Sequence, residues 1–259
     1  MQKNIINAIC NIVSFANSDL KSNVSNKSGI FNKTDDLMED YIKDAIAGSF
    51  QLPINKKMDF YTKSFSYLGN QNNPPHIIVK NGDAFEIRKI KNFNSYLTLN
   101  GPPLRNKLLD SDIRITTACK NCESKSWKEK DLFYTVVNTK RKNLKYLFFI
   151  QGVCYAAEPK TYEKNKKRLR NIKSKGSFIY NLKYGKTKNP LIYFKEHLNP
   201  SPKKFNIYAM IETKKYNSFP KKDRENLEKL GDVKITDLKI KSPNDCNYAM
   251  NVKLISCAV

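Results

Sequence analysis

The feature that most restricts the fold of this chain is a two-residue turn, Asn81-Gly82, between two short apolar segments. Ile77-Ile78-Val79 precedes the turn and residues 84–90 follow it, and both segments are rich in β-branched or aromatic residues. Asn-Gly is a strong hairpin signal because both residues readily adopt positive φ. The pattern therefore predicts an antiparallel β-hairpin, in which successive side chains point to opposite faces.

Helical and extended periodicities flank this hairpin and predict a mixed fold. Apolar residues at helical spacing predict helices at 5–13, from residue 34 or 35 to Gly48, and at 55–67. We expect a second hairpin from 132–138 and 144–151, a basic helix near 159–175 and a short helix near 220–230. Further strands are expected at 178–184, 191–195, 205–212, 233–240 and 248–257. This order indicates an α+β or mixed α/β class.

The charge of the chain is large and unevenly distributed. Lys and Arg number 47 against 24 acidic residues, a formal net charge of +23, divided as 0 over residues 1–60, +9 over 61–150 and +14 over 151–259. Such a field attracts polyanions. A general bias toward Lys does not explain a neutral first quarter. We therefore expect the phosphate backbone of a nucleic acid as partner, and double-stranded DNA rather than RNA, because no aromatic residues alternate with basic ones as in base-stacking surfaces.

No segment of the sequence is long and apolar enough to span a membrane. The longest run, residues 146–150, is far below the roughly 20 residues required. The first helix is interrupted by Asn residues and is amphipathic, unlike a signal peptide. Six scattered cysteines are typical of a reducing compartment. These features predict a cytoplasmic protein.

The hairpin also carries the residues with the clearest chemistry. Glu86 and Arg88 are two apart on a strand and share one face, whereas Lys89 points the other way. His76 begins the neighbouring strand at the open end of the hairpin. Metal-dependent nucleases combine such groups: a carboxylate holds Mg²⁺, the metal activates water, and a cation stabilises the charge that develops on phosphorus. The alternative is an ordinary ion pair between Glu86 and Arg88.

Three other motifs have weaker support. Cys119 and Cys122 are spaced like half a zinc site or are ordinary thiols, and no second such pair exists. Gly185-Lys186-Thr187 lacks the glycine that a phosphate-binding loop requires at position 180. The basic helix near 159–175 is either a solvated face or a phosphate-binding surface, with candidate contacts Lys164, Lys166, Lys167 and Arg168.

Several sequence blocks resemble the NgoPII-type restriction endonucleases, which belong to the PD-(D/E)XK nucleases and act on GG…CC-type duplex sites. The blocks are NIINAI from residue 4, EDYIKDAIAGSF from residue 39, FSYLGNQNNPP from residue 65, GDAFEIRKI from residue 82, and residues 117–131. The resemblance extends to about residue 158. It implies a nuclease core over residues 1–157, with helices packed on a mixed sheet, and a basic, β-rich specificity portion over residues 158–259.

The resemblance also implies roles for individual residues. The family's catalytic pattern is Pro-Pro-Asp, then a hairpin, then Glu-x-Lys. By this resemblance, Glu86 is retained, and His76 and Arg88 stand where the family has Asp and Lys. Glu86, His76 and Glu39 become candidate ligands for Mg²⁺, or for the softer Mn²⁺ because imidazole suits softer ions. Arg88 keeps the positive charge but does not readily exchange a proton. A catalytically degenerate DNA-binding protein on the same fold is the alternative.

The expected setting follows from the family as well. Candidate DNA-binding residues in the C-terminal portion are Lys203, Lys204, Lys214 and Lys215, because Lys and Arg contact phosphates and guanine. A homodimer, a prokaryotic cytoplasm and a cognate DNA methyltransferase are expected by analogy.

Overall fold

A computed structural model describes residues 3–21, 35–90, 105–140, 143–158, 160, 204–245 and 247–259. The strands expected at 178–184 and 191–195 lie outside these ranges. The basic helix expected at 159–175 also lies outside them, except for Lys160.

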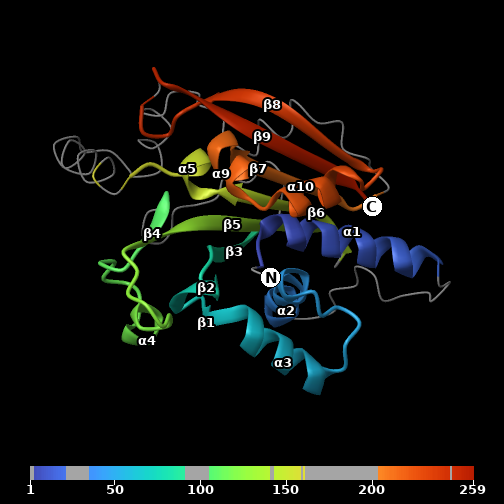
Figure 1. The fold of residues 1–259 in the computed structure, drawn as a ribbon, viewed down its shortest axis with the longest axis horizontal. Coiled ribbons are helices and arrows are strands. Elements are labelled where there is room, and N and C mark those ends of the chain that lie inside the picture. The colour runs from blue at the N-terminus through green and yellow to red at the C-terminus, as the bar shows by residue number, and fades with distance from the viewer. Residues whose placement is uncertain are drawn as a thin grey trace.

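Within the described residues, a mixed nine-stranded sheet forms the centre of the molecule (Figure 1). Its order is β1-β2-β3-β5-β6-β7-β9-β8, and β4 pairs with β5 outside this path. The pairs β3/β5 and β6/β7 are parallel, and the others are antiparallel. The strands are β1 Phe65–Asn70, β2 Asn73–Val79, β3 Ala84–Ile90, β4 Lys107–Leu109, β5 Glu129–Lys140, β6 Asn143–Gln151, β7 Asn206–Glu212, β8 Val233–Lys241 and β9 Ala249–Ala258.

The described helices are three longer ones within residues 5–64 and four shorter ones later in the chain. They are α1 Ile5–Lys21, α2 Asp35–Ala47, α3 Ile54–Ser64, α4 Thr117–Lys120, α5 Gly152–Tyr155, α9 Thr213–Ser218 and α10 Lys221–Glu228. In Figure 1, α1 and α2 lie beside each other and α10 lies against α1. None of the described helices is long and apolar enough to cross a membrane.

Alternation along the strands divides the core into two clusters. Phe85 and Phe133 face the first cluster, where they meet the buried apolar stripes of α1 and α2. Ala84 and Tyr134 face the opposite side and belong to the second cluster, with Leu108 from β4. Side chains two residues apart on β3 therefore share a face, as a pleated strand requires.

The structure confirms the fold class and both hairpins. Strand β2 pairs antiparallel with β3 through Ile77↔Phe85 and Ile78↔Ala84, and Asn81 in the turn has φ of 53°. Strands β5 and β6 form the second hairpin, with Val136 opposite Phe148. The expected strands near 205–212, 233–240 and 248–257 are β7, β8 and β9, and the helix near 220–230 is α10. The sequence did not predict β4, α4, α5 or α9.

The helix expected at 55–67 is wrong at its end. Helix α3 stops at Ser64, and Phe65–Asn70 instead forms the edge strand β1, which pairs with β2. Gly69 is needed for this tight approach, because a Cβ on it would lie 2.2 Å from the carbonyl oxygen of Asn73. Pairing with a neighbouring strand, which local periodicity does not report, decided the conformation.

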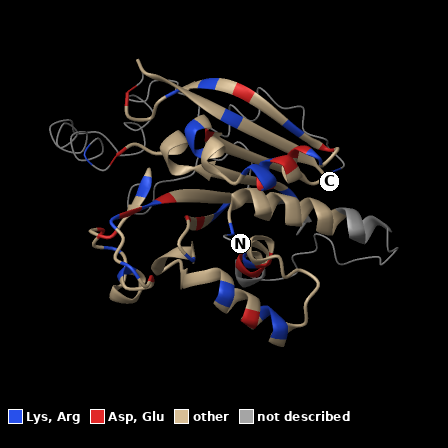
Figure 2. Ribbon diagram, viewed as in Figure 1, with Lys and Arg blue, Asp and Glu red and all other residues tan. Residues whose placement is uncertain are grey.

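The two portions expected from the sequence share this sheet. Strand β6 pairs in parallel with β7, so the ladder continues from residues before 157 to residues after 158. The division of the chain at this point therefore stays a prediction. In the part of the chain that the structure describes, Lys and Arg occur on many elements, from α3 to β8, rather than on one of them (Figure 2).

Candidate active site

The candidate catalytic residues lie where β2 and β3 separate. The paired positions between these strands are Ile77↔Phe85 and Ile78↔Ala84. The next opposed positions, His76 and Glu86, lie just beyond the paired part of the ladder. Both residues are buried, with 5% and 7% of their surface exposed. The hairpin register that the Asn81-Gly82 turn sets thus brings these two side chains together.

Glu86 is held by two partners. His76 Nδ1 lies 3.0 Å from Glu86 Oε2, and Arg88 Nη2 lies 3.0 Å from Glu86 Oε1. Arg88 shares the face of Glu86, as expected for residues two apart on a strand, and its side chain is 43% exposed. One guanidinium edge therefore holds the buried carboxylate while the rest of the group reaches solvent.

A second carboxylate approaches from helix α2. Glu39 Oε1 lies 3.6 Å from His76 Nε2, so the imidazole ring lies between two carboxylates from different elements. The sequence predicted Glu39 as a further acid for this site, and the structure brings it to His76. The ion pair between Glu86 and Arg88 that sequence alone left as an alternative is present, but as part of this larger group.

Proton positions on His76 follow from its neighbours. A proton on Nδ1 makes the 3.0 Å contact with Glu86 a hydrogen bond, because an ionised carboxylate oxygen only accepts. Without that proton, Nδ1 would instead accept from the backbone N–H of Ile87, at a longer 3.4 Å. A neutral ring with its proton on Nδ1 directs the lone pair of Nε2 at Glu39 Oε1. That arrangement is favourable only if the ring is charged or a cation or water molecule lies between the two atoms.

These donors fit a divalent metal ion with few protein ligands. In the described part of the chain, no three His, Cys, Asp or Glu side chains already surround one point where a metal would lie. Mg²⁺ and related ions, however, are commonly held by one or two carboxylates and complete their shell with water and phosphate oxygens. The unbonded Nε2–Oε1 pair of His76 and Glu39 and the carboxylate of Glu86 suit such a site. The imidazole nitrogen favours a softer ion than Mg²⁺.

A second group of charges lies at the start of β3, on the face opposite Glu86. Lys215 Nζ lies 2.6 Å from Asp83 Oδ1 and 2.8 Å from Asp131 Oδ2, beside a cavity of about 350 Å³. Burial raises the pKa of Asp83, although Lys215 opposes the shift. Burial alone would lower the pKa of Lys215, but Asp83 and Asp131 raise it. Through these two ion pairs, Lys215 connects α9 to the start of β3 and to β5.

The expected DNA-binding residues are only partly described. Five of them lie outside the described residues, namely Lys164, Lys166, Lys167, Arg168 and Lys203. Lys204 is exposed and donates to the carbonyl of Ala258, and Lys214 is exposed on α9. Lys215 is mostly buried with its two carboxylate partners. A DNA contact by any of these residues stays a prediction.

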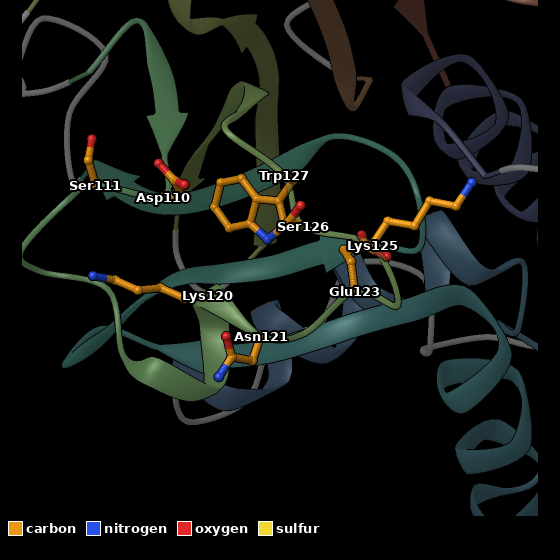
Figure 3. A pocket seen from close by; sticks show the side chains of 8 residues that line it. All are labelled: Asp110, Ser111, Lys120, Asn121, Glu123, Lys125, Ser126 and Trp127. Atoms are coloured by element: carbon orange, nitrogen blue, oxygen red, sulfur yellow. The ribbon is translucent and has the colours of Figure 1, made fainter.

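A larger cavity, of about 530 Å³, lies away from the candidate catalytic residues (Figure 3). Trp127 and Lys120 line it, together with Asp110 and Ser111 of the loop after β4. None of the catalytic candidates contributes to its wall, so cavity size does not locate the site here. The candidate site is instead the group formed by Glu39, His76, Glu86 and Arg88.

The Cys119–Cys122 pair has the properties of ordinary thiols. Both cysteines are free, and burial raises the pKa of Cys119 to about 12 and raises that of Cys122. The described residues also contain no group of three or more potential metal ligands around this pair.

Comparison with known proteins gives the same family as the sequence blocks. The model of the NgoPII restriction endonuclease family matches residues 3–187. A curated relative, the type II restriction enzyme NgoPII of Neisseria gonorrhoeae, is 34% identical over 277 residues, which cover 98% of this chain and 99% of the relative. The similarity therefore continues well past residue 158, where the sequence blocks ended. No solved structure matches the chain.

Proposed function

This chain belongs to the NgoPII restriction endonuclease family. On that premise, we propose that it is a type II restriction endonuclease that hydrolyses double-stranded DNA at a short specific site. The proposed active site consists of Glu86, Arg88, His76 and Glu39. The observation that carries the proposal is the convergence of two carboxylates, an imidazole and a guanidinium where β2 and β3 separate. Three of these residues stand at the positions of the family's catalytic pattern, and helix α2 adds the fourth.

Arg88 is the group that contacts the scissile phosphate. Its guanidinium is held by Glu86 and its side chain is 43% exposed, so it can donate to a phosphate oxygen while it keeps its carboxylate partner. A pre-positioned cation lowers the energy of the more negatively charged transition state. Since an arginine in a protein stays protonated, Arg88 stabilises charge and does not transfer a proton.

Glu86, Glu39 and His76 are the residues that would hold a divalent metal ion. When bound, the ion would supply a water molecule of lowered pKa as the nucleophile. Glu86 provides a hard oxygen ligand whose orientation is set by Arg88 and His76. His76 replaces the oxygen ligand that the family has at this position, so the site is suited to Mn²⁺ at least as well as to Mg²⁺.

The partners of the enzyme follow from the same proposal. Double-stranded DNA with GG…CC-type sites is the substrate, and a cognate methyltransferase protects the host sites. Two copies of the chain act together, because the described residues of each copy form one candidate site and a duplex has two strands to cut. The net charge of +23 supports rapid, salt-sensitive association with the duplex.

A second candidate function rests on one observation. His76 and Arg88 already occupy both carboxylate oxygens of Glu86, so the protein could bind DNA specifically without cutting it. A digest of unmethylated plasmid DNA with Mg²⁺ or Mn²⁺ separates the two functions. Discrete fragments that disappear with Glu86→Ala support the nuclease. Specific retention of plasmid fragments without cleavage supports the binding protein.

A further inference from the structure

The loop between β4 and α4 presents an isoleucine almost entirely to solvent. Ile113 is 93% exposed, more than any other large apolar residue that the structure describes. Single exposed apolar residues are common and by themselves indicate nothing. Ile54 on α3, which is 83% exposed, is such a residue. What distinguishes Ile113 is the way in which its backbone is held.

Asp112 fixes the loop directly beside Ile113. Its carboxylate is buried, with 3% of the residue exposed, and accepts from the backbone N–H of Arg114 at 3.0 Å. It also pairs with Arg105 Nη1 at 2.7 Å and Arg114 Nη2 at 3.1 Å. The buried carboxylate of Asp112, just before Ile113, thereby binds Arg114, just after it, and also Arg105. The isoleucine is held outward on a rigid turn, rather than on a loop free to fold back over it.

The base of the loop is attached to the sheet. The hydroxyl of Tyr134 on β5 accepts from the backbone N–H of Arg105 at 2.6 Å and donates to its carbonyl at 2.9 Å. Gly152 packs so closely on this segment that a Cβ there would lie 2.2 Å from the carbonyl oxygen of Asn106. The chain of contacts therefore runs from β5, through Arg105 and Asp112, to Ile113.

The base of the Ile113 loop lies on the same face of the sheet as Glu86. Leu108 and Ile115, on either side of the turn, are both buried in the second core cluster with Ala84. Tyr134 belongs to that cluster and is the register partner of Glu86 in the parallel β3/β5 pair. Since register partners share a face, Glu86 and the base of the Ile113 loop are on one side of the sheet.

We propose that Ile113 enters a groove of bound double-stranded DNA and packs against the bases. The inference rests on the proposed function. Apolar side chains that proteins direct at DNA contact thymine methyl groups or wedge between base steps, and basic neighbours hold the backbones beside them. Residues 105–130 supply 7 basic residues against 4 acidic ones. The two arginines are fixed by Asp112, so the isoleucine meets the duplex without first ordering the loop.

The test compares two exposed isoleucines. Three variants are purified: Ile113→Ala, Ile113→Leu and Ile54→Ala. Thermal unfolding establishes that all three are folded. Binding to short fragments of unmethylated plasmid DNA is measured in Ca²⁺ over a series of salt concentrations. We expect Ile113→Ala to weaken binding about 10-fold or more, the equivalent of removing one buried aliphatic side chain. Ile113→Leu should stay near wild type, and Ile54→Ala should equal it.

The salt series identifies the kind of interaction. An apolar interaction releases no counterions, so Ile113→Ala should lower affinity by the same factor at every salt concentration, with the slope unchanged. Equal affinity of Ile113→Ala and wild type, or an equal decrease in both alanine variants, would overturn the proposal. If wild type binds the fragments but never cuts plasmid DNA, the nuclease activity fails while this comparison still decides the role of Ile113. Absence of binding by wild type overturns both.

Discussion

Glu86 Oε2 lies 3.0 Å from His76 Nδ1, across the point where β2 and β3 separate. An imidazole thus bonds to the carboxylate that we propose as a metal ligand. The other oxygen of Glu86 is bonded to Arg88. The consequences of these two bonds can be measured.

The first prediction is that Glu86 is indispensable for cleavage but not for binding. Glu86→Gln keeps the size of the side chain and removes its charge, and with it a metal ligand. Plasmid cleavage should fall by at least about 100-fold, and affinity for the duplex should change little. Single-turnover cleavage and fragment binding measure the two quantities. Glu129→Gln, which removes a 54%-exposed carboxylate, is the control and should cut normally. Cleavage by Glu86→Gln at the wild-type rate would place the active site elsewhere.

The second prediction concerns the metal. Chelation with EDTA should abolish cleavage, and Mn²⁺ should restore it more effectively than Mg²⁺, because the nitrogen of His76 suits the softer ion. Initial rates over a concentration series of each ion provide the measurement. His76→Asp should reverse the preference toward Mg²⁺. An unchanged Mn²⁺-to-Mg²⁺ ratio in that variant would show that His76 is not a ligand.

A third prediction separates a working site from a degenerate one. His76→Asp combined with Arg88→Lys restores the oxygen ligand and the proton-exchanging cation of the family pattern. The double variant should cut faster in Mg²⁺ than wild type, by more than the two single changes together predict, because ligand and cation act as a unit. The single-turnover rate at saturating protein measures this. A double variant that binds DNA but cuts more slowly than wild type would show that the His76–Arg88 pair is itself a competent design.

The fourth prediction addresses the basic segment beyond the described residues. Replacing Lys164, Lys166, Lys167 and Arg168 by Ala should flatten the salt dependence of DNA binding, by about 0.9 in log–log slope for each phosphate that the variant no longer neutralises. The slope comes from binding isotherms at several salt concentrations. Lys221→Ala, which removes an 83%-exposed side chain on α10, should leave the slope near that of wild type. If the fourfold variant keeps the wild-type slope, the segment is a solvated surface.

The fifth prediction tests the Lys215 group. Lys215→Met removes the cation between Asp83, at the start of β3, and Asp131 on β5. It should lower the free energy of unfolding by about 3 kcal/mol at neutral pH. The pKa of Lys215 is raised in the folded protein, so its stabilisation is complete below the ordinary value of 10.5 and disappears as pH rises through the folded value. Urea unfolding of wild type and Lys215→Met should therefore converge above pH 10.5. A constant difference across that range would contradict this origin.

Much of the fold follows from local patterns. The Asn81-Gly82 turn fixed the register that opposes His76 and Glu86, and helical spacing located α1 and α2. Local patterns failed at Phe65–Asn70, where pairing with β2 overrode an apparent helix. They also missed short elements such as α9 and β4, which have too few residues for a period to appear.

The sequence by itself determined the hairpin, the shared face of Glu86 and Arg88, the high positive charge and the family. Each of these depends on residues close together along the chain, or on a count of residues. Only the tertiary structure decided that Glu39 reaches His76, that Lys215 lies between Asp83 and Asp131, and that Asp112 holds Ile113 outward. The first two sets of contacts join residues on separate elements, and their partners are chosen by how α2 and α9 pack on the sheet. The third is local, but it depends on the burial of Asp112 in the folded protein. Periodicity along one element carries no information about that packing.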